Sequence, residues 1–182
     1  MIRFFDFIFS FFGILLLSPI ILILFVIGLF DTGSPFFLQK RVGKNKTSFT
    51  LIKFRTMRKD TQSVATHLAN KNAITTFGSF LRRTKLDELP QLFNVLTGEM
   101  SLVGARPNLF NQFELIKERE KRGVYNFLPG ITGLAQINEI DMSTPVELAE
   151  KDAEMYSTLN VRNYFYYIFA TVGGKGQGDR IK

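Results

Sequence analysis

The sequence has no cysteine and no tryptophan, and His67 is its only histidine in 182 residues. Without cysteine, the chain can form neither a disulfide bond nor a thiolate metal site, and this composition fits a reducing compartment. A lone histidine also lacks the partners needed for a metal cluster or a catalytic triad. Any chemistry must therefore come from carboxylates, hydroxyls, lysines and arginines.

The chain is rich in phenylalanine, with 20, and carries a net charge of +7 that is unevenly distributed. Residues 31–60 hold eight basic and two acidic residues, a net charge of +6. Such a block suits an anionic partner, such as phospholipid headgroups, a phosphorylated substrate or nucleic acid. The alternative is a basic face that is simply solvated.

A long apolar run, Phe7–Phe30, contains no charged residue. As a helix it would extend about 36 Å, enough to cross a hydrocarbon core of about 30 Å. A secretory signal peptide is disfavoured, because the run is too long and no small-x-small cleavage site follows it. The sequence therefore predicts a membrane-embedded helix.

Ser18 and Pro19 lie at the middle of this run, where proline removes a helical hydrogen bond. Two topologies remain open: a kinked helix that spans the membrane, and a re-entrant helix that breaks at Ser18-Pro19 and returns. Basic residues after the run favour placing its C-terminal end in the cytoplasm. In the re-entrant case both ends would lie on that side.

Residues 36–43 and 48–57 read as two short strands around a Gly43-Lys44-Asn45 turn, which predicts a β-hairpin. Side chains alternate between the faces of a strand, so Lys53 and Arg55 would share one face.

Helices are predicted over residues 74–96, as one or two elements, over 107–122 with one apolar face, and over 144–159. Thr144-Pro145-Val146-Glu147 is a strong helix start. Residues 163–172 either pack in the core or lie at the membrane surface, and residues 173–182 read as a flexible tail. The fold class expected is α+β, mainly α.

Two phosphate-binding motifs are suggested by the sequence but fail on inspection. Residues 42–48, VGKNKTS, lack the earlier glycine of a phosphate loop, since Leu38 occupies its place. GKGQG at residues 174–178 has no helix or second strand after it. No nucleic-acid-binding module is recognisable either, so nucleic acid is not an expected partner.

Asp87 and Glu88 are adjacent in a segment that otherwise reads as an apolar helix. One interpretation is structural: Thr84 would cap a helix and Asp87 would occupy its third position, as in a capping box. Pro90 argues against it, because a proline inside a continuous helix costs about 3 kcal/mol.

The other interpretation is chemical. One carboxylate can act as a nucleophile, and a second beside it suits Mg²⁺, which also binds phosphate oxygens. Basic side chains would neutralise a transferring phosphate. The candidates are Lys53, Arg55, Arg82 and Arg106.

Three long segments resemble the bacterial sugar transferases, the small monotopic phosphoglycosyl transferases. They are FLQKRVGKNKTSFTLIKFRTM, LRRTKLDELPQLFNVLTGEMSLVGARP and PGITGLAQIN, and the resemblance covers most of the chain. It implies transfer of a phosphosugar from a UDP-sugar to polyprenyl (undecaprenyl) phosphate with release of UMP, the first membrane step of glycoconjugate assembly. Asp87 would attack the β-phosphate, and Glu88 would bind the Mg²⁺ cofactor. Lys53, Arg55, Arg82 and Arg106 match basic family positions that bind phosphate or support the acidic pair.

The resemblance also implies where the protein resides. Residues 1–30 would form a re-entrant membrane helix broken at Ser18-Pro19. Residues 31–182 would form a catalytic domain on the cytoplasmic face of the bacterial inner membrane, in contact with phospholipid. It leaves open the sugar, the glycan pathway and whether the chain forms a homo-oligomer.

The sequence departs from the family pattern at two places. Ala105 stands where a proline commonly precedes the arginine of the PRP motif. Glu139-Ile140-Asp141 stands where an arginine is expected to help bind the nucleotide; Asp141 or Arg122 could take its place. The rival, non-enzymatic interpretation is a membrane adaptor held on anionic lipid by the basic block.

Overall fold

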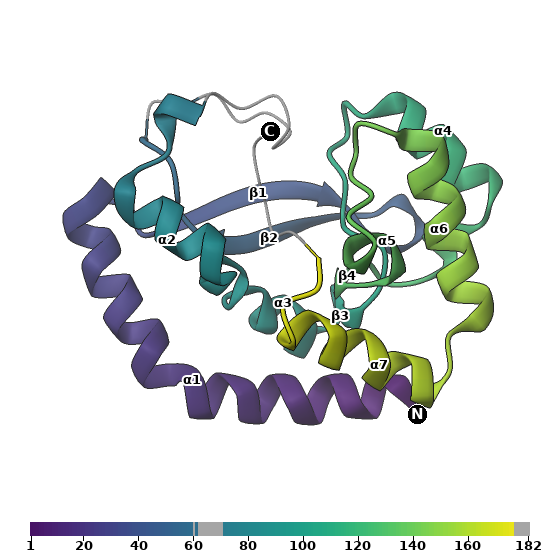
Figure 1. Cartoon of the computed structure of the whole chain (residues 1–182), viewed down its shortest axis with the longest axis horizontal. Coiled ribbons are helices and arrows are strands. Elements are labelled where there is room, and N and C mark those ends of the chain that lie inside the picture. Colours follow the sequence, from purple (N-terminus) through teal and green to yellow (C-terminus); the bar gives the residue numbers. More distant parts are fainter. Residues whose placement is uncertain (60, 62–70, 177–182) are drawn as a thin grey trace.

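A computed structural model describes residues 1–59, 61 and 71–176 of the chain. The described part is mainly helical with one hairpin and one short parallel strand pair, which confirms the expected α+β class (Figure 1). The helices are α1 (Ile2–Thr32), α2 (Thr76–Thr84), α3 (Gln91–Thr97), α4 (Phe113–Lys121), α5 (Leu134–Ile137), α6 (Pro145–Thr158) and α7 (Val161–Val172). The strands are β1 (Phe36–Val42), β2 (Ser48–Phe54), β3 (Ser101–Val103) and β4 (Gly130–Thr132). Short 3₁₀ turns are η1 (Lys44–Lys46), η3 (Lys71–Ala73), η4 (Leu86–Glu88) and η5 (Val124–Asn126). His67 and the last part of the expected tail, 177–182, lie outside the described residues.

The apolar run forms α1, which continues through Ser18 and Pro19 instead of breaking there. Its axis turns near the middle of the helix (Figure 1), and Pro19 lies half-way along its sequence. Because Pro19 has no N–H, the carbonyl of Leu15 loses its helical partner, and the Ser18 hydroxyl donates to it at 2.8 Å. The helix break predicted at Ser18-Pro19 is therefore a bend in a continuous helix, and the carbonyl that it frees accepts a hydrogen bond from a neighbouring side chain.

Both ends of α1 are attached to the rest of the chain. At its start, the buried Asp6 carboxylate accepts hydrogen bonds from the Ser101 hydroxyl (3.0 Å), the Leu102 N–H (2.9 Å) and the Tyr164 hydroxyl (2.9 Å). At its end, Asp31 accepts a hydrogen bond from the Thr75 hydroxyl at 2.7 Å. The two halves of the helix thus contact one and the same body.

The predicted hairpin is confirmed. Strands β1 and β2 are antiparallel, with Phe36 opposite Phe54 and Val42 opposite Ser48. Asn45 in the connecting turn has a φ of 53°, a left-handed conformation that asparagine tolerates better than most residues. Phe49 and Leu51 on β2 pack on Val95 and Met100, which fixes the hairpin over α3.

Of two later helices, one differs from its predicted extent and the other matches it. The segment expected as one helix over 107–122 is helical only from Phe113, because the main chain before it is bonded to β1: the Val42 N–H donates to the Asn108 carbonyl at 3.0 Å. The helix predicted over 144–159 is confirmed as α6, with Pro145 in its first turn.

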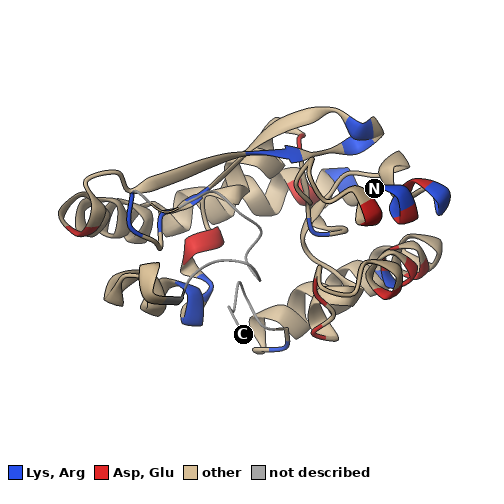
Figure 2. Cartoon of the chain, turned by 90° about the horizontal axis from the view of Figure 1, so that it is seen from above, with Lys and Arg blue, Asp and Glu red and all other residues tan. Residues whose placement is uncertain are grey.

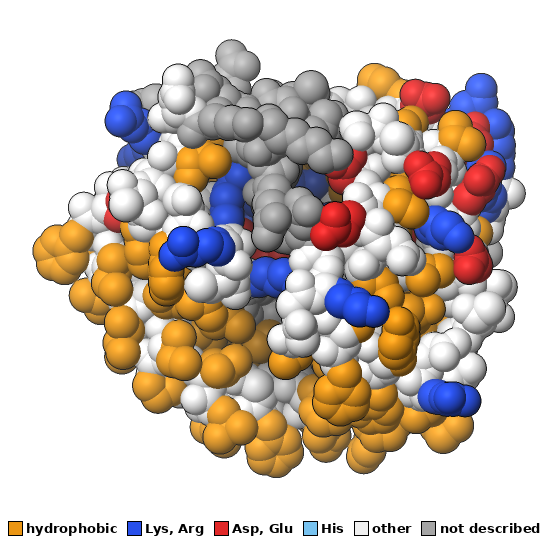
Figure 3. All heavy atoms as spheres, in the orientation of Figure 1, with side chains coloured by type: hydrophobic (Ala, Val, Ile, Leu, Met, Phe, Trp, Pro, Cys, Tyr) orange, Lys and Arg blue, Asp and Glu red, His pale blue; other side chains and the backbone are white. Residues whose placement is uncertain are grey.

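Helix α7 packs in the core by one face, which confirms the first alternative for residues 163–172, and leaves the membrane-surface alternative a prediction for its other face. Tyr164 and Tyr167 are buried in the core beside Val103 and Met155. Phe169 and Val172 lie on the outside and are 68% and 81% exposed. Figure 3 shows that hydrophobic side chains cover the edge of the molecule formed by α1 and α7, whereas charged side chains gather away from this edge.

Candidate active site

The two adjacent acids lie on η4, a single 3₁₀ turn between α2 and α3. Lys85 ends α2 in a left-handed conformation with a φ of 60°, and Pro90 occupies the position that starts α3. Because proline lacks the N–H needed to continue a helix, the acids sit on a connection and not inside one helix. Asp87 is buried, at 2% exposed.

The capping-box interpretation of Thr84 is wrong. Thr84 is the last residue of α2, and its hydroxyl donates back to the carbonyls of Phe80 (2.9 Å) and Leu81 (3.1 Å). It therefore caps no helix that contains Asp87.

Arg106 reaches η4 from the segment that follows β3. Its Nη2 lies 2.7 Å from Glu88 Oε1, and both side chains are largely covered. A charge-assisted hydrogen bond of this kind is roughly twice as strong as a neutral one. The structure thus brings together three predicted site residues: Asp87, Glu88 and Arg106.

Arg82 lies on α2 and is buried against the segment that follows β2. Its Nε donates to the Thr56 hydroxyl at 2.8 Å. This close approach depends on Gly78, where a Cβ would lie 2.0 Å from the Thr56 carbonyl oxygen.

Lys53 and Arg55 flank the ring of Phe37, as their shared face predicts. The Lys53 ammonium lies 5.7 Å and the Arg55 guanidinium 5.5 Å from the ring centroid, within the range of cation–π attraction. Arg55 also donates to the carbonyls of Ser34 (2.9 Å) and Phe36 (3.1 Å). It therefore ties the link between α1 and β1 to the end of β2.

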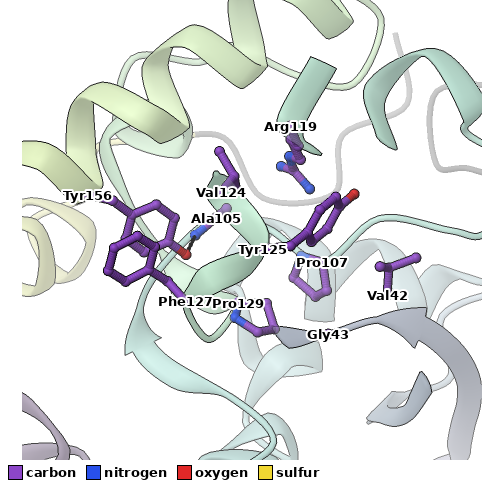
Figure 4. A pocket seen from close by; sticks show the side chains of 10 residues that line it. All are labelled: Val42, Gly43, Ala105, Pro107, Arg119, Val124, Tyr125, Phe127, Pro129 and Tyr156. Atoms are coloured by element: carbon purple, nitrogen blue, oxygen red, sulfur yellow. Dashed lines mark hydrogen bonds between the residues drawn. The ribbon is translucent and has the colours of Figure 1, made fainter. Parts of the chain in front are cut away.

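The main chain around Arg106 is held from several sides. Arg41 donates to the Pro107 carbonyl at 3.0 Å, and Arg119 donates to the Arg106 carbonyl at 2.9 Å. The Ala105 N–H donates to the Tyr156 hydroxyl at 2.8 Å (Figure 4). A proline at position 105 could not make this bond, so the departure from the family pattern adds a contact here.

Removing the Tyr156 hydroxyl is expected to loosen this segment. The hydroxyl also donates to the Leu128 carbonyl at 2.8 Å, and burial raises the pKa of Tyr156, which keeps the donor proton in place. Tyr156→Phe should preserve the stacking on Phe127, whose ring centroid is 4.3 Å away, and lower the free energy of unfolding by about 2–4 kcal/mol. Thermal unfolding measures this loss. Tyr166→Phe, at an exposed position, is the control, and equal unfolding midpoints for the two variants would contradict the prediction.

At the second departure from the family pattern, Glu139-Ile140-Asp141, both suggested substitutes for the arginine are bonded to neighbouring residues. Asp141 accepts a hydrogen bond from the Ser143 N–H at 2.8 Å, as in an Asx turn. Arg122 pairs with Glu118 and, at 2.9 Å, with Glu150. Figure 2 shows such interleaved acidic and basic residues at the end of the molecule that carries α4 and α6.

The acidic pair fits the donor chemistry of Mg²⁺. This ion binds through one or two carboxylates and completes its octahedron with water and phosphate oxygens. Across residues 1–59, 61 and 71–176 there is no group of three or more His, Cys, Asp or Glu side chains able to hold a metal. An ion at Glu88 would thus depend on water and substrate oxygens for its remaining ligands.

Several residues of the site and its support were missed by sequence reasoning. Asp6, Arg119, Asp152 and Tyr156 each act through a contact with a segment far away in the chain. The only sequence signal is weak: Asp6 immediately precedes the apolar run, where a charge has to be paired or solvated.

Comparison with known proteins gives a consistent result. A family model described as "Bacterial sugar transferase" matches residues 1–175. The chain is 41% identical over 143 residues to the UDP-glucose:undecaprenyl-phosphate glucose-1-phosphate transferase of Xanthomonas campestris pv. campestris, covering 75% of this chain and 29% of that protein. It is 34% identical over 182 residues to the UDP-galactose-lipid carrier transferase of Erwinia amylovora, covering 87% of this chain and 36% of that protein.

A shorter relative matches over most of its length. The exopolysaccharide production protein ExoY of Rhizobium meliloti is 36% identical over 167 residues, which covers 79% of this chain and 73% of that protein. The chain thus spans about a third of the two longer relatives and nearly three quarters of ExoY.

Proposed function

Because the chain belongs to the bacterial sugar transferase family, we propose that it transfers a phosphosugar from a UDP-sugar to polyprenyl phosphate and releases UMP. The observation that carries the proposal is the η4 turn, where a buried Asp87 adjoins a Glu88 that is paired with Arg106. The names of the two longer relatives support the class of donor and acceptor, a UDP-sugar and a lipid carrier. They differ in the sugar, so the proposal assigns none.

The proposed reaction has two displacements at the same phosphorus. An oxygen of the Asp87 carboxylate attacks the β-phosphorus, a new P–O bond forms, and the bond to the bridging oxygen breaks as UMP leaves. A phosphate oxygen of polyprenyl phosphate then attacks, the bond to Asp87 breaks, and the carboxylate is regenerated. The product is a polyprenyl diphosphate sugar, and neither step needs an external oxidant or reductant.

The surroundings of Asp87 support this role. Its burial would keep bulk water away from the acyl phosphate that links Asp87 to the phosphosugar, which would otherwise be hydrolysed. Arg106 orients Glu88, and Lys53 and Arg82 contribute positive charge from β2 and α2. We assign Mg²⁺ to Glu88, where the ion would neutralise charge on the diphosphate.

UMP release tests the function and the covalent step together. Purified protein with Mg²⁺ and a panel of UDP-sugars should release UMP steadily only when undecaprenyl phosphate is present. Without the acceptor, it should exchange labelled UMP into the UDP-sugar, because the first displacement is reversible. Turnover without exchange would exclude the intermediate, and no turnover with any UDP-sugar would favour the adaptor.

We also propose that α1 is re-entrant and that the catalytic part lies on the cytoplasmic face of the inner membrane. Supporting this, Arg3 near the start of α1 donates to the carbonyls of Val95 (2.7 Å) and Met100 (3.0 Å). Asp31 near its end bonds Thr75. A straight span would separate these two sets of contacts by the thickness of a bilayer. The basic block after α1 favours the cytoplasmic side.

Cysteine labelling tests this topology, and the natural chain contributes no background thiol. Single cysteines at Phe4 and Phe30, both highly exposed near the ends of α1, should react with an impermeant maleimide from the cytoplasmic side of inverted vesicles. A cysteine at Leu16, 75% exposed near the bend, should be protected by lipid until detergent is added. Labelling of the two ends from opposite sides would refute re-entry.

A further inference from the structure

Arg119 on α4 and Asp152 on α6 form an ion pair in the interior of the molecule. They are 1% and 0% exposed, and Arg119 Nε and Nη2 lie 2.9 and 2.7 Å from Asp152 Oδ2. Neither residue takes part in the chemistry proposed above.

Stability alone accounts poorly for this pair. Removing two charges from water costs about as much as their attraction returns, and apolar residues of similar volume often serve as well. Asp152 Oδ1 is buried and has no hydrogen-bond partner among the described residues, which adds to the cost. Burial raises the pKa of the Asp152 carboxyl, and the Arg119 charge opposes this shift.

The remaining nitrogen of Arg119 points to the segment before α4. Nη1 donates to the Arg106 carbonyl at 2.9 Å and to Asn108 Oδ1 at 2.8 Å. The Tyr125 hydroxyl donates to the same Asn108 oxygen at 3.0 Å. Arg119, Tyr125 and Pro107 line the same small pocket, and in Figure 4 Arg119 extends from its helix toward the other two residues.

The carbonyl that Arg119 holds belongs to the residue whose side chain pairs with Glu88. Fixing that peptide limits where the Arg106 side chain begins, and hence where its guanidinium meets Glu88. Asp152 in turn fixes the rotation of the Arg119 guanidinium, because two of its nitrogens share one carboxylate oxygen.

We propose that Arg119, held by Asp152, is a positioning residue: it sets the main chain at Arg106 so that Arg106 can orient Glu88. The inference rests on the proposed function for its catalytic consequence, but the coupling it describes exists without substrate. The more exposed pair Arg122–Glu150 differs from the buried pair: within the described part of the chain, the Arg122 side chain bonds only Glu118 and Glu150 and makes no hydrogen bond to the Arg106 segment.

A double-mutant cycle on turnover tests the proposal. Arg119→Lys keeps a charge beside Asp152 but cannot supply the fork that also reaches the Arg106 carbonyl. It should lower kcat about 10- to 100-fold, on the scale of a lost hydrogen bond to a charged group, with KM for the UDP-sugar changed less than about threefold. In an Arg106→Ala background the same substitution should cause no further loss. Equal losses in both backgrounds would overturn the proposal.

Lys151→Gln is the matched control, because Lys151 adjoins Asp152 on α6 but pairs outward with Glu154 at 2.7 Å. Its kcat should stay within about twofold of the wild type. If Arg119→Lys does not fold, Asp152→Asn is compared in the same two backgrounds. It should lower kcat in the wild-type background, by less than Arg119→Lys is expected to, and should cause no loss in the Arg106→Ala background. Unchanged kcat in both Arg119→Lys and Asp152→Asn would also overturn the proposal.

A second measurement does not depend on activity. Thermal midpoints of Arg106→Ala, Glu88→Gln and the double variant give the coupling between these side chains. This coupling should be present in the wild type and in Lys151→Gln and should vanish in Arg119→Lys. A wild type that binds no UDP-sugar would refute the proposed function, whereas a coupling that persists in Arg119→Lys would refute the positioning role.

Discussion

Asp87→Asn is expected to lower kcat by about 10³-fold or more while the protein stays folded, as when an enzyme loses its nucleophile. The amide has nearly the same shape as the carboxylate, but its oxygen is too weak a nucleophile to displace UMP. The Arg106–Glu88 pair needs no atom of Asp87, so the geometry of the neighbouring residues should survive. The measurement is UMP release under single-turnover conditions, together with UMP exchange in the absence of acceptor.

Glu154→Gln serves as the control, because Glu154 is a carboxylate on α6 whose ion-pair partner among the described residues is the exposed Lys151. Its turnover should match the wild type. Steady UMP release by Asp87→Asn at more than about a tenth of the wild-type rate would remove Asp87 from the nucleophile role.

Gly78→Ala is expected to destabilise the protein strongly. Alanine normally stabilises a helix by about 0.5–1 kcal/mol relative to glycine. Here, however, a Cβ would lie 2.0 Å from the Thr56 carbonyl oxygen and 2.6 Å from its Cα, which are main-chain atoms with little freedom to move. Helix α2 would have to separate from the end of β2, breaking the Arg82–Thr56 hydrogen bond.

The expected cost is about 3 kcal/mol, or about 6–12 °C in the unfolding midpoint for a chain of this size. Circular dichroism in detergent micelles would follow the transition. Gly13→Ala is the control, since its Cβ would meet only the tip of Leu92 at 3.3 Å. A midpoint for Gly78→Ala equal to that of Gly13→Ala would show that α2 is not held as the structure has it.

Local patterns in the sequence were enough to predict the hairpin, α6 and the apolar helix. Each depends on residues close in sequence: alternation around the turn at Asn45, the helix start at Thr144-Pro145, and the uncharged run Phe7–Phe30. The acidic pair was singled out by the same means, because Pro90 conflicts with a continuous helix.

The segments whose structure was predicted wrongly are those in which contacts with distant parts of the chain override the local preference. Residues 107–112 have the apolar spacing of a helix, yet β1 and Arg41 form hydrogen bonds with their main chain instead. Arg119 and Asp152 look like ordinary solvated charges on amphipathic helices, and only the packing of α4 on α6 reveals that they are buried. Arg119 and Asp152 are 33 residues apart, so no periodic pattern in the sequence indicates that they pair.

The contacts of α1 also set an order of events during synthesis. The helix leaves the ribosome before its partners do, since Asp6 accepts bonds from Ser101, Leu102 and Tyr164, and the last of these is 158 residues further along the chain. Until that residue emerges, the carboxylate lacks this partner and has to be hydrated at the start of an apolar helix. The start of α1 therefore cannot reach its final packing before the segments that carry Ser101, Leu102 and Tyr164 have been made and have folded against it.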